Sequence, residues 1–194
     1  MAEQLSLTGF EPAGAPTDRL FFAILPDADA AARIVALTQR LRAQHGLKGA
    51  PLARERLHVT LYFLGDHIGV PQGIVAKASA VADALVRPSF EMLFDRVLSF
   101  GRAGRNNAFV LRGGDAPSAL VDFQRGLAAA LSREGLGRDM HAFVPHVTLL
   151  YDDRSVAEHS VETVQWTAKE LVLVRSVLGH GRHEPMARWP LDSK

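Results

Sequence analysis

A short segment occurs twice in this chain, at two places that lie 88 residues apart. Leu57–Leu61 reads LHVTL and Pro145–Leu149 reads PHVTL, so His-Val-Thr-Leu is repeated without change. Each copy lies in an apolar stretch that follows a predicted helix. A repeat at this spacing in a chain of 194 residues predicts two similar α+β lobes that face each other. No other feature of the sequence limits the fold as much.

In a β-strand, the polar and the apolar side chains of the repeated segment point to opposite faces. Successive side chains of a β-strand point to opposite faces, so the His and the Thr of each copy share one face, and the Val and the Leu share the other. The apolar face can build the core, whereas two buried pairs of His and Thr cost free energy unless they bind something. If a pseudo-twofold axis relates the lobes, these four polar side chains converge on one cleft.

Two imidazoles and two hydroxyls around one small ligand suit acid–base chemistry on a phosphodiester. The unperturbed pKa of His is about 6.5, so one imidazole can take a proton from a nucleophile while the other gives one to a leaving group. The Thr hydroxyls can donate hydrogen bonds to non-bridging phosphate oxygens, so this chemistry requires no metal ion. A cyclic phosphodiester fits, because in-line attack needs a base and an acid on opposite sides of phosphorus. The repetition of the motif favours this interpretation over two ordinary strands.

The composition limits the kinds of ligand and site. Lys and Arg number 22 and Asp and Glu number 21, so the net charge is +1 and an anionic ligand must be held by a local cluster. The absence of cysteine excludes disulfide scaffolds, thiolate zinc sites, iron–sulfur clusters and cysteine nucleophiles. The chain has no apolar run near about 18 residues and no signal-peptide pattern, so we expect a cytoplasmic protein with no membrane partner.

The patterning predicts one structured domain after a short leader. Residues 1–18 contain two Pro and two Gly and no periodic apolar pattern, which predicts a flexible leader, and residues 19–191 form a single bilobal domain. Apolar patterning and turn residues predict strands over 20–26, 56–65, 90–100, 108–113, 143–152, 170–178 and 186–191, helices from Asp27 to near Gly46, over 71–86 and from 115 to 135 or 137, and a polar loop over 153–169.

At the repeated motifs the chain resembles the two-histidine (2H) phosphoesterases. Within them it is most similar to the RNA 2′,3′-cyclic phosphodiesterases, also called the 2′-5′ RNA ligase family, whose signature is a pair of His-x-Thr-x motifs. The similarity covers essentially residues 19–191, and the segments that carry it besides the motifs are Arg19–Ile24, Phe63–Gly65, Pro145, Gly181-Arg182 and Arg188-Trp189.

The resemblance implies a fold, a reaction and a set of roles. It implies a duplicated bilobal α+β fold, with antiparallel β-sheets lining a central cleft and helices packed outside. It implies metal-independent, cofactor-independent hydrolysis of terminal 2′,3′-cyclic phosphates of RNA ends or oligonucleotides to 2′-phosphates, and a reversible 2′-5′ ligation. By the same resemblance, His58 and His146 are catalytic, on the attacking water and on the departing O3′ respectively, and Thr60 and Thr148 bind the phosphate. We expect the protein to be a monomer.

One position departs from the family pattern. Several family members carry Arg three residues after the second motif's Thr, where this chain has Tyr151. Arg154, Arg182 or Arg102 can supply the missing positive charge from loops. In a regular strand Tyr151 lies on the face opposite to His146, so it reaches the cleft only if the strand twists or bulges near its end.

Other residues near the motifs are candidates for contacts with the substrate. Phe143 and Tyr151 bracket the second motif and can stack on a nucleobase, although Phe143 is equally well explained as a core residue. Arg56 shares a face with His58, so it either contacts the RNA backbone or is solvated at the start of the strand. Arg182 is a further candidate, from the last turn.

Two other classes of function stay open. His141, Asp152 and Asp153 flank the second motif and together with His146 can complete the site of a metal-dependent phosphoesterase. A non-catalytic module that binds RNA ends or nucleotides is the other alternative. Sensitivity to chelators and turnover of product distinguish these classes.

A third group of titratable residues lies near the C-terminus. His180, His183 and Glu184 superficially resemble a metal cluster, but their order in a Gly- and Pro-containing segment does not match a helical zinc motif. The sequence therefore predicts a surface turn here.

Overall fold

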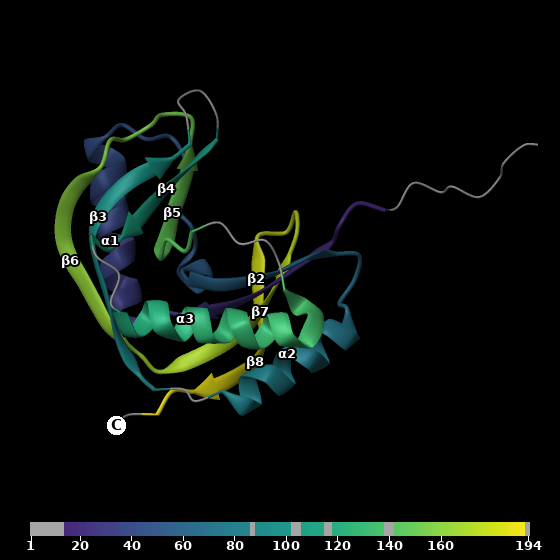
Figure 1. The fold of residues 1–194 in the computed structure, drawn as a ribbon. Coiled ribbons are helices and arrows are strands. Elements are labelled where there is room, and N and C mark those ends of the chain that lie inside the picture. The colour runs from purple at the N-terminus through teal and green to yellow at the C-terminus, as the bar shows by residue number, and fades with distance from the viewer. Residues whose placement is uncertain (1–13, 86–87, 102–105, 115–117, 138–141, 193–194) are drawn as a thin grey trace, which may run out of the picture.

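The computed structural model describes residues 14–85, 88–101, 106–114, 118–137 and 142–192. These residues form three α-helices, two short helical turns and eight strands (Figure 1). In chain order the elements are β1 (Asp18–Ile24), α1 (Ala28–Gln44), η1 (Arg54–Arg56), β2 (Val59–His67), α2 (Gln72–Ala84), β3 (Phe90–Phe100), β4 (Asn107–Arg112), α3 (Ser118–Leu131), η2 (Ser132–Leu136), β5 (His146–Asp152), β6 (His159–Ala168), β7 (Glu170–Val177) and β8 (Arg182–Pro190). None of the described helices is both long enough and apolar enough to cross a membrane.

The strands form one antiparallel sheet made of two halves. The strand order is β6-β3-β4-β5-β2-β1-β7-β8, so the motif strands β2 and β5 are neighbours at the centre. They are joined through a single residue pair, Val59 with Val147, which are equivalent positions of the repeat. The predicted α+β class with antiparallel strands is therefore confirmed, and the two expected sheets meet at this one pair.

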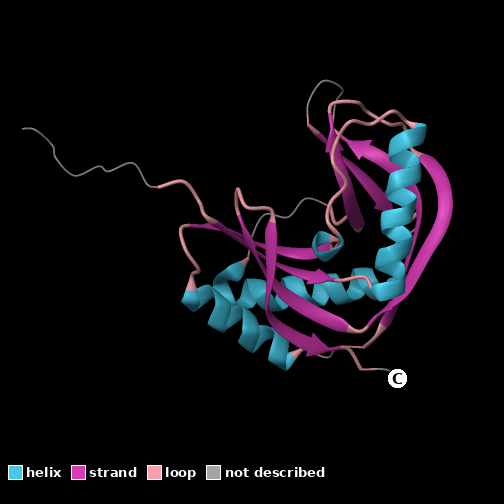
Figure 2. Cartoon of the chain, turned by 180° about the vertical axis from the view of Figure 1, so that it is seen from behind, coloured by secondary structure: helices cyan, strands magenta, loops and turns pink. Residues whose placement is uncertain are grey.

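The helices tie the two halves together. α1 connects β1 to β2 but packs against β5 and β6 in the other half, and α3 connects β4 to β5 but packs against β2 as well as β3. α2 packs against α3 and β8, and both views show α2 and α3 side by side (Figures 1 and 2). The helix that connects two strands of one half thus packs partly on strands of the other half. The two halves therefore share one core.

Each motif strand contains a β-bulge at the Leu of the motif. In β2 the residue pairing with β1 skips Leu61, and in β5 the pairing with β4 skips Leu149. A bulge adds one residue to a strand, so the alternation of side chains reverses beyond it. Accordingly, the consecutive residues Leu61 and Tyr62, and likewise Leu149 and Leu150, are all buried in the core.

Two strands differ from the sequence prediction. β6 occupies His159–Ala168, most of the stretch predicted to be a polar loop. It is an edge strand of the sheet, so only Val164, Trp166 and Ala168 are buried, and its polar residues face solvent. β8 begins at Arg182, inside the predicted turn, because it pairs with β7 along its whole length.

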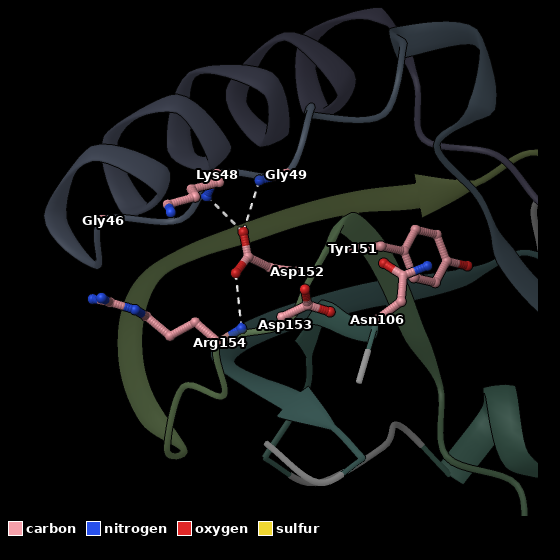
Figure 3. A pocket seen from close by; sticks show the side chains of 8 residues that line it. All are labelled: Gly46, Lys48, Gly49, Asn106, Tyr151, Asp152, Asp153 and Arg154. Carbon is pink, nitrogen blue, oxygen red and sulfur yellow. Dashed lines mark hydrogen bonds between the residues drawn. The ribbon is translucent and has the colours of Figure 1, made fainter. Parts of the chain in front are cut away.

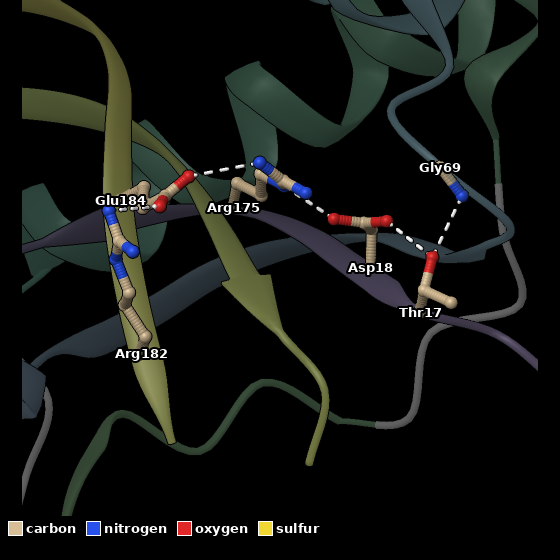
Figure 4. Close-up of polar contacts among 6 residues, drawn as sticks. All are labelled: Thr17, Asp18, Gly69, Arg175, Arg182 and Glu184. Carbon is tan, nitrogen blue, oxygen red and sulfur yellow. Dashed lines mark hydrogen bonds and ion pairs between the residues drawn. The ribbon is translucent and has the colours of Figure 1, made fainter. Parts of the chain in front are cut away.

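A polar network fixes the start of β1 to β7 and β8 (Figure 4). The buried carboxylate of Asp18 accepts hydrogen bonds from Thr17 Oγ1, at 2.6 Å, and from Arg175 Nε. Arg175 also pairs with Glu184, at 3.1 Å, and Glu184 pairs with Arg182, at 2.8 Å. These hydrogen bonds, led by those from Thr17 and Arg175, hold the pKa of Asp18 below its usual value.

We predict that Asp18→Asn lowers the melting temperature at pH 7. Because the pKa of Asp18 is lower in the folded than in the unfolded protein, its stabilisation is present above the unfolded value of about 3.9 and is lost as the pH falls through the folded value. The difference between the wild type and the variant should therefore narrow in acid. Thermal melts at pH 7 and near pH 3 measure it, with Asp122→Asn, in an exposed ion pair, as the control. A constant difference across this range would contradict the prediction.

Candidate active site

A cleft of about 320 Å³ lies over the junction of the two motif strands. Six of the eight site residues predicted from the sequence line it, namely Arg56, His58, Thr60, His146, Thr148 and Tyr151. The volume is at the lower end of the range for small-molecule sites. The structure thus brings both motifs to one cavity, as the repeat predicted.

The register of the two strands explains this convergence. Val59 pairs with its own counterpart Val147, so the local twofold axis of the repeat passes through this pair. In an antiparallel pair the residue before one Val lies beside the residue after the other. His58 is therefore on the side of Thr148, and His146 is on the side of Thr60.

Both motif histidines are held in the same tautomer. His58 Nδ1 lies 2.7 Å from the backbone oxygen of Arg56, and His146 Nδ1 lies 2.8 Å from that of Val144. A carbonyl oxygen can only accept, so in each case Nδ1 carries the proton and donates it. Nε2 of each neutral ring is then a lone-pair base, which is the arrangement that proton transfer requires.

Burial favours the neutral form of both rings. It lowers the pKa of His58 and of His146, and the backbone hydrogen bond to each ring offsets part of this. The charges of His146 and Arg56 lower the pKa of His58 further. An aromatic ring packs against each imidazole, with ring centroids 4.8 Å apart for Phe21 and His58 and 5.0 Å apart for Phe100 and His146. The two histidines are therefore alike in orientation but differ in electrostatic surroundings.

The bulge at Leu149 brings Tyr151 to the cleft. Tyr151 lines the same cavity as His146 and Thr148, and 44% of it is exposed. The condition stated from the sequence, a bulge near the end of the strand, is met. The equivalent bulge in β2 brings Phe63 to the cleft, at the same distance of five residues after the motif His.

Among the described residues, the positive charge in the cleft comes from residues other than Arg154 and Arg182. Arg154 donates to the backbone oxygen of His45, and Arg182 pairs with Glu184; neither lines the cleft. Arg102 lies outside the described residues. Arg182 lies in an exposed ion pair at the start of β8 and not in the cleft lining, so its contact with the substrate stays a prediction from the sequence.

Arg56 and Arg19 line the cleft instead. Arg19 forms two hydrogen bonds with Asp66, at 2.8 and 2.9 Å, and its guanidinium lies 5.5 Å from the centre of the Phe63 ring. Within the described part of the chain Arg56 has no ion pair, and its buried Nε has no hydrogen-bond partner. A buried donor without a partner is costly, so Arg56 is the best-placed group to bind an anionic ligand.

Two further side chains depart from the sequence interpretation. Phe143 is half-buried against the core and does not line the cleft, which supports its alternative role in packing. His183 does line the cleft, so the predicted surface turn was wrong at this residue. A sequence signal existed for Phe63, which stands five residues after His58 as Tyr151 does after His146, but none marked His183.

The described residues of the metal alternative lie in two different cavities, and Figure 3 shows the one that contains Asp152 and Asp153. Asp152 accepts hydrogen bonds from the backbone nitrogens of Lys48, Gly49 and Arg154, at 2.5, 2.7 and 2.8 Å. These bonds, that from Arg154 first, lower its pKa. Asp152 and Asp153 line a neighbouring cavity that does not include His146. His141 lies outside the described residues, and those described contain no group of three His or carboxylate side chains placed to hold a metal ion.

Comparison with known proteins gives one consistent family. A family model described as the 2′-5′ RNA ligase superfamily matches residues 6–180. The chain is 29% identical over 179 residues to the RNA 2′,3′-cyclic phosphodiesterase of Escherichia coli (strain K12), across 89% of this chain and 96% of that protein.

Solved structures agree in fold over nearly the whole chain. A crystal structure of a phosphoesterase is 30% identical, with a TM-score of 0.71, and the match covers 91% of this chain and 98% of that one. The crystal structure of E. coli LigT complexed with 3′-AMP is also 30% identical, with a TM-score of 0.68 and the same coverage.

We predict that all three cleft histidines take up protons below the ordinary pKa of His, which is about 6.5. Burial and the neighbouring His58 and Arg56 lower the pKa of His183 to about 4. Burial is also the main cause that lowers the pKa of His58 and of His146. NMR of the imidazole ring protons, assigned with single His→Gln variants, measures the three pKa values. A cleft histidine with a pKa at or above the ordinary value would contradict the prediction.

Proposed function

The chain belongs to the 2′-5′ RNA ligase superfamily of two-histidine phosphoesterases, and from this premise we propose that it is an RNA 2′,3′-cyclic phosphodiesterase. The reaction is the opening of a terminal 2′,3′-cyclic phosphate to a 2′-phosphate. The observation that carries the proposal is the pair of motif histidines, each with Nδ1 bound to a backbone oxygen, in one cleft with two Thr hydroxyls. The name of the E. coli relative supports the same reaction.

The electrostatic difference between the histidines supports a direction for the reaction. Groups that share a site but differ in environment take different acid–base roles. The charge of Arg56 favours neutral His58, so His58 Nε2 takes the proton of the attacking water. Among the described residues no arginine lowers the pKa of His146, so His146 is the ring that carries a proton once the anionic phosphate is bound. It gives its Nε2 proton to O3′ as the P–O3′ bond breaks. The product is a 2′-phosphate with a free 3′-hydroxyl.

The remaining residues of the cleft stabilise the charge on phosphorus. Thr60 and Thr148 donate hydrogen bonds to the non-bridging oxygens, which gain charge in the transition state. Arg56 supplies the positive charge that the family Arg supplies where this chain has Tyr151. Charge-assisted hydrogen bonds are about twice as strong as neutral ones, so Arg56 contributes more to phosphate binding than Tyr151.

RNA ends or oligonucleotides with a 2′,3′-cyclic phosphate are the proposed substrates, and a reversible 2′-5′ ligation is proposed with them. The aromatic rings of Phe63 and Tyr151 can stack on unpaired bases beside the reacting phosphate. The complex of E. coli LigT with 3′-AMP supports a nucleotide ligand. A cytoplasmic location and a monomeric state stay predictions from the sequence.

Incubation with an oligonucleotide that ends in a 2′,3′-cyclic phosphate tests the proposal. We predict 2′-phosphate as the product, at the same rate with and without EDTA. Removal of a general acid or base typically reduces the rate about 10²- to 10⁴-fold, so His58→Gln and His146→Gln should each lose this much. Chromatography against 2′- and 3′-phosphate standards identifies the product.

Each alternative function has its own outcome in this experiment. Binding without turnover would leave only the non-catalytic module. Loss of activity with EDTA and recovery with a divalent ion would favour the metal-dependent alternative. A folded His146→Gln variant with wild-type turnover would refute the two-histidine mechanism.

We predict that Arg56→Gln weakens binding of a 2′-nucleotide about ten- to a hundredfold, the usual effect of one hydrogen bond to a charged group. Tyr151→Arg in the same chain should restore part of the affinity, because residue 151 lines the same cleft. Arg54→Gln is the matched control, since Arg54 belongs to the same helical turn but donates to the backbone of Ala28. Isothermal titration calorimetry measures the affinities. Equal affinities for the two single Gln variants would show that Arg56 does not bind phosphate.

A further inference from the structure

The cleft contains a third imidazole that the proposed hydrolysis does not use. His183 lies at the start of β8, opposite Ser176 of β7, and both line the cleft. Its ring meets His58 edge to face, with centroids 5.1 Å apart and an angle of 74°. It also contacts Phe21, at 5.6 Å. His146 has no such second imidazole among the described residues.

The strand around His183 is held in place from its other face. Consecutive residues of a strand point to opposite faces, so the neighbouring Glu184 points away from the cleft. There it is fixed by ion pairs with Arg175 and Arg182 (Figure 4). The polar network therefore determines the position of the His183 ring beside His58.

The cleft extends mainly to the His58 side. The turn between β7 and β8 forms a wall there, with Ser176, Gly179 and Gly181 among its lining residues. A Cβ atom on Gly181 would lie 3.5 Å from Nη1 of Arg56, so the guanidinium lies against this turn. Beyond the His146 side the described residues that line the cleft include Tyr151 but form no comparable wall. The lining by described residues is thus asymmetric about the two catalytic rings.

In an in-line displacement the leaving group and the attacking group lie on opposite sides of phosphorus. The ribose of a 2′,3′-cyclic phosphate carries the departing O3′, so it lies towards His146, and the attacking group comes from the side of His58. On the His58 side the lining of the cleft continues past His183 to Ser176, Val177, Leu178 and Gly179. An attacking group larger than water can therefore contact the protein there.

We infer that His183 is a specificity-determining residue that binds the attacking nucleophile, and that the wall of β7 and β8 beside it accepts the 5′-hydroxyl of a second nucleoside. This inference rests on the proposed function. The hydroxyl oxygen attacks phosphorus, its proton passes to His58 Nε2, the P–O3′ bond breaks, and His146 protonates O3′. The product is a 2′-5′ phosphodiester with a free 3′-hydroxyl, and no other reactant is consumed.

A neutral imidazole suits a hydroxyl ligand. It presents one N–H donor and one acceptor nitrogen, whereas the nearby Arg56 can only donate. Burial, His58 and Arg56 lower the pKa of His183 to about 4, so it stays neutral at pH 7. It can therefore orient the hydroxyl without adding a second positive charge beside His58 when that ring takes the proton.

The ratio of two products tests the inference. The full-length protein is incubated with adenosine 2′,3′-cyclic phosphate and excess adenosine at neutral pH, and the 2′-5′-linked dinucleotide and 2′-AMP are quantified by chromatography. His183→Phe keeps an aromatic ring against His58 and Phe21 but removes both nitrogens. We expect it to lower the ratio of dinucleotide to 2′-AMP about fivefold, the usual effect of one neutral hydrogen bond. His180→Phe, an exposed neighbour outside the cleft, should leave the ratio unchanged.

The outcomes separate this inference from the proposed function. No 2′-AMP from the wild type would refute the proposed function itself. Normal 2′-AMP with no dinucleotide would leave the proposed hydrolysis standing and refute the 2′-5′ ligation together with the inference. An unchanged ratio in a folded His183→Phe would refute the inference alone, since a purely structural role lowers both products together. If His183→Phe does not fold, His183→Gln replaces it, and a ratio equal to that of an Ala variant would refute hydrogen bonding to the nucleophile.

Discussion

The pairing of Val59 with Val147 is the constraint on which the rest of the structure depends. These residues are equivalent in the repeat, so an antiparallel pair between them makes the two motif strands related by a local twofold axis. A register shift of one residue would turn one His and one Thr to the opposite face. The core residues on the buried face, Leu61 and Leu149 among them, prevent such a shift because they would become exposed.

Placing two imidazoles on these strands in a partly buried cleft costs free energy. Burial disfavours the charged form of each ring, and the backbone hydrogen bond to Nδ1 offsets part of that cost while fixing the tautomer. The bulges add a second consequence, because they turn Phe63 and Tyr151 towards the cleft without disturbing the motif residues before them. The site is therefore built by local strand geometry on a core that both halves share.

Features that depend on neighbouring residues in the chain could be predicted from the sequence, whereas features that depend on contacts between distant segments could not. The alternation within His-Val-Thr-Leu predicted the shared face of His58 and Thr60. The helix predicted to begin at Asp27 is α1, whose N-cap is Asp27 with its side chain accepting from the backbone nitrogen of Ala30. β6 was missed because an edge strand buries few side chains and so lacks an apolar pattern. His183 was missed because its place in the cleft depends on the pairing of β8 with β7, which is a long-range contact.

A site built from two copies of one motif needs residues around it that make its two histidines chemically different. Two equivalent histidines would have the same pKa, whereas in-line displacement needs one base and one acid. The residues around the motif strands break the twofold symmetry, because Arg56 and His183 lie beside His58 and have no counterpart beside His146 among the described residues. Each half thus supplies one imidazole by the same local geometry. The different surroundings of the two rings determine which of them acts as the base and which as the acid.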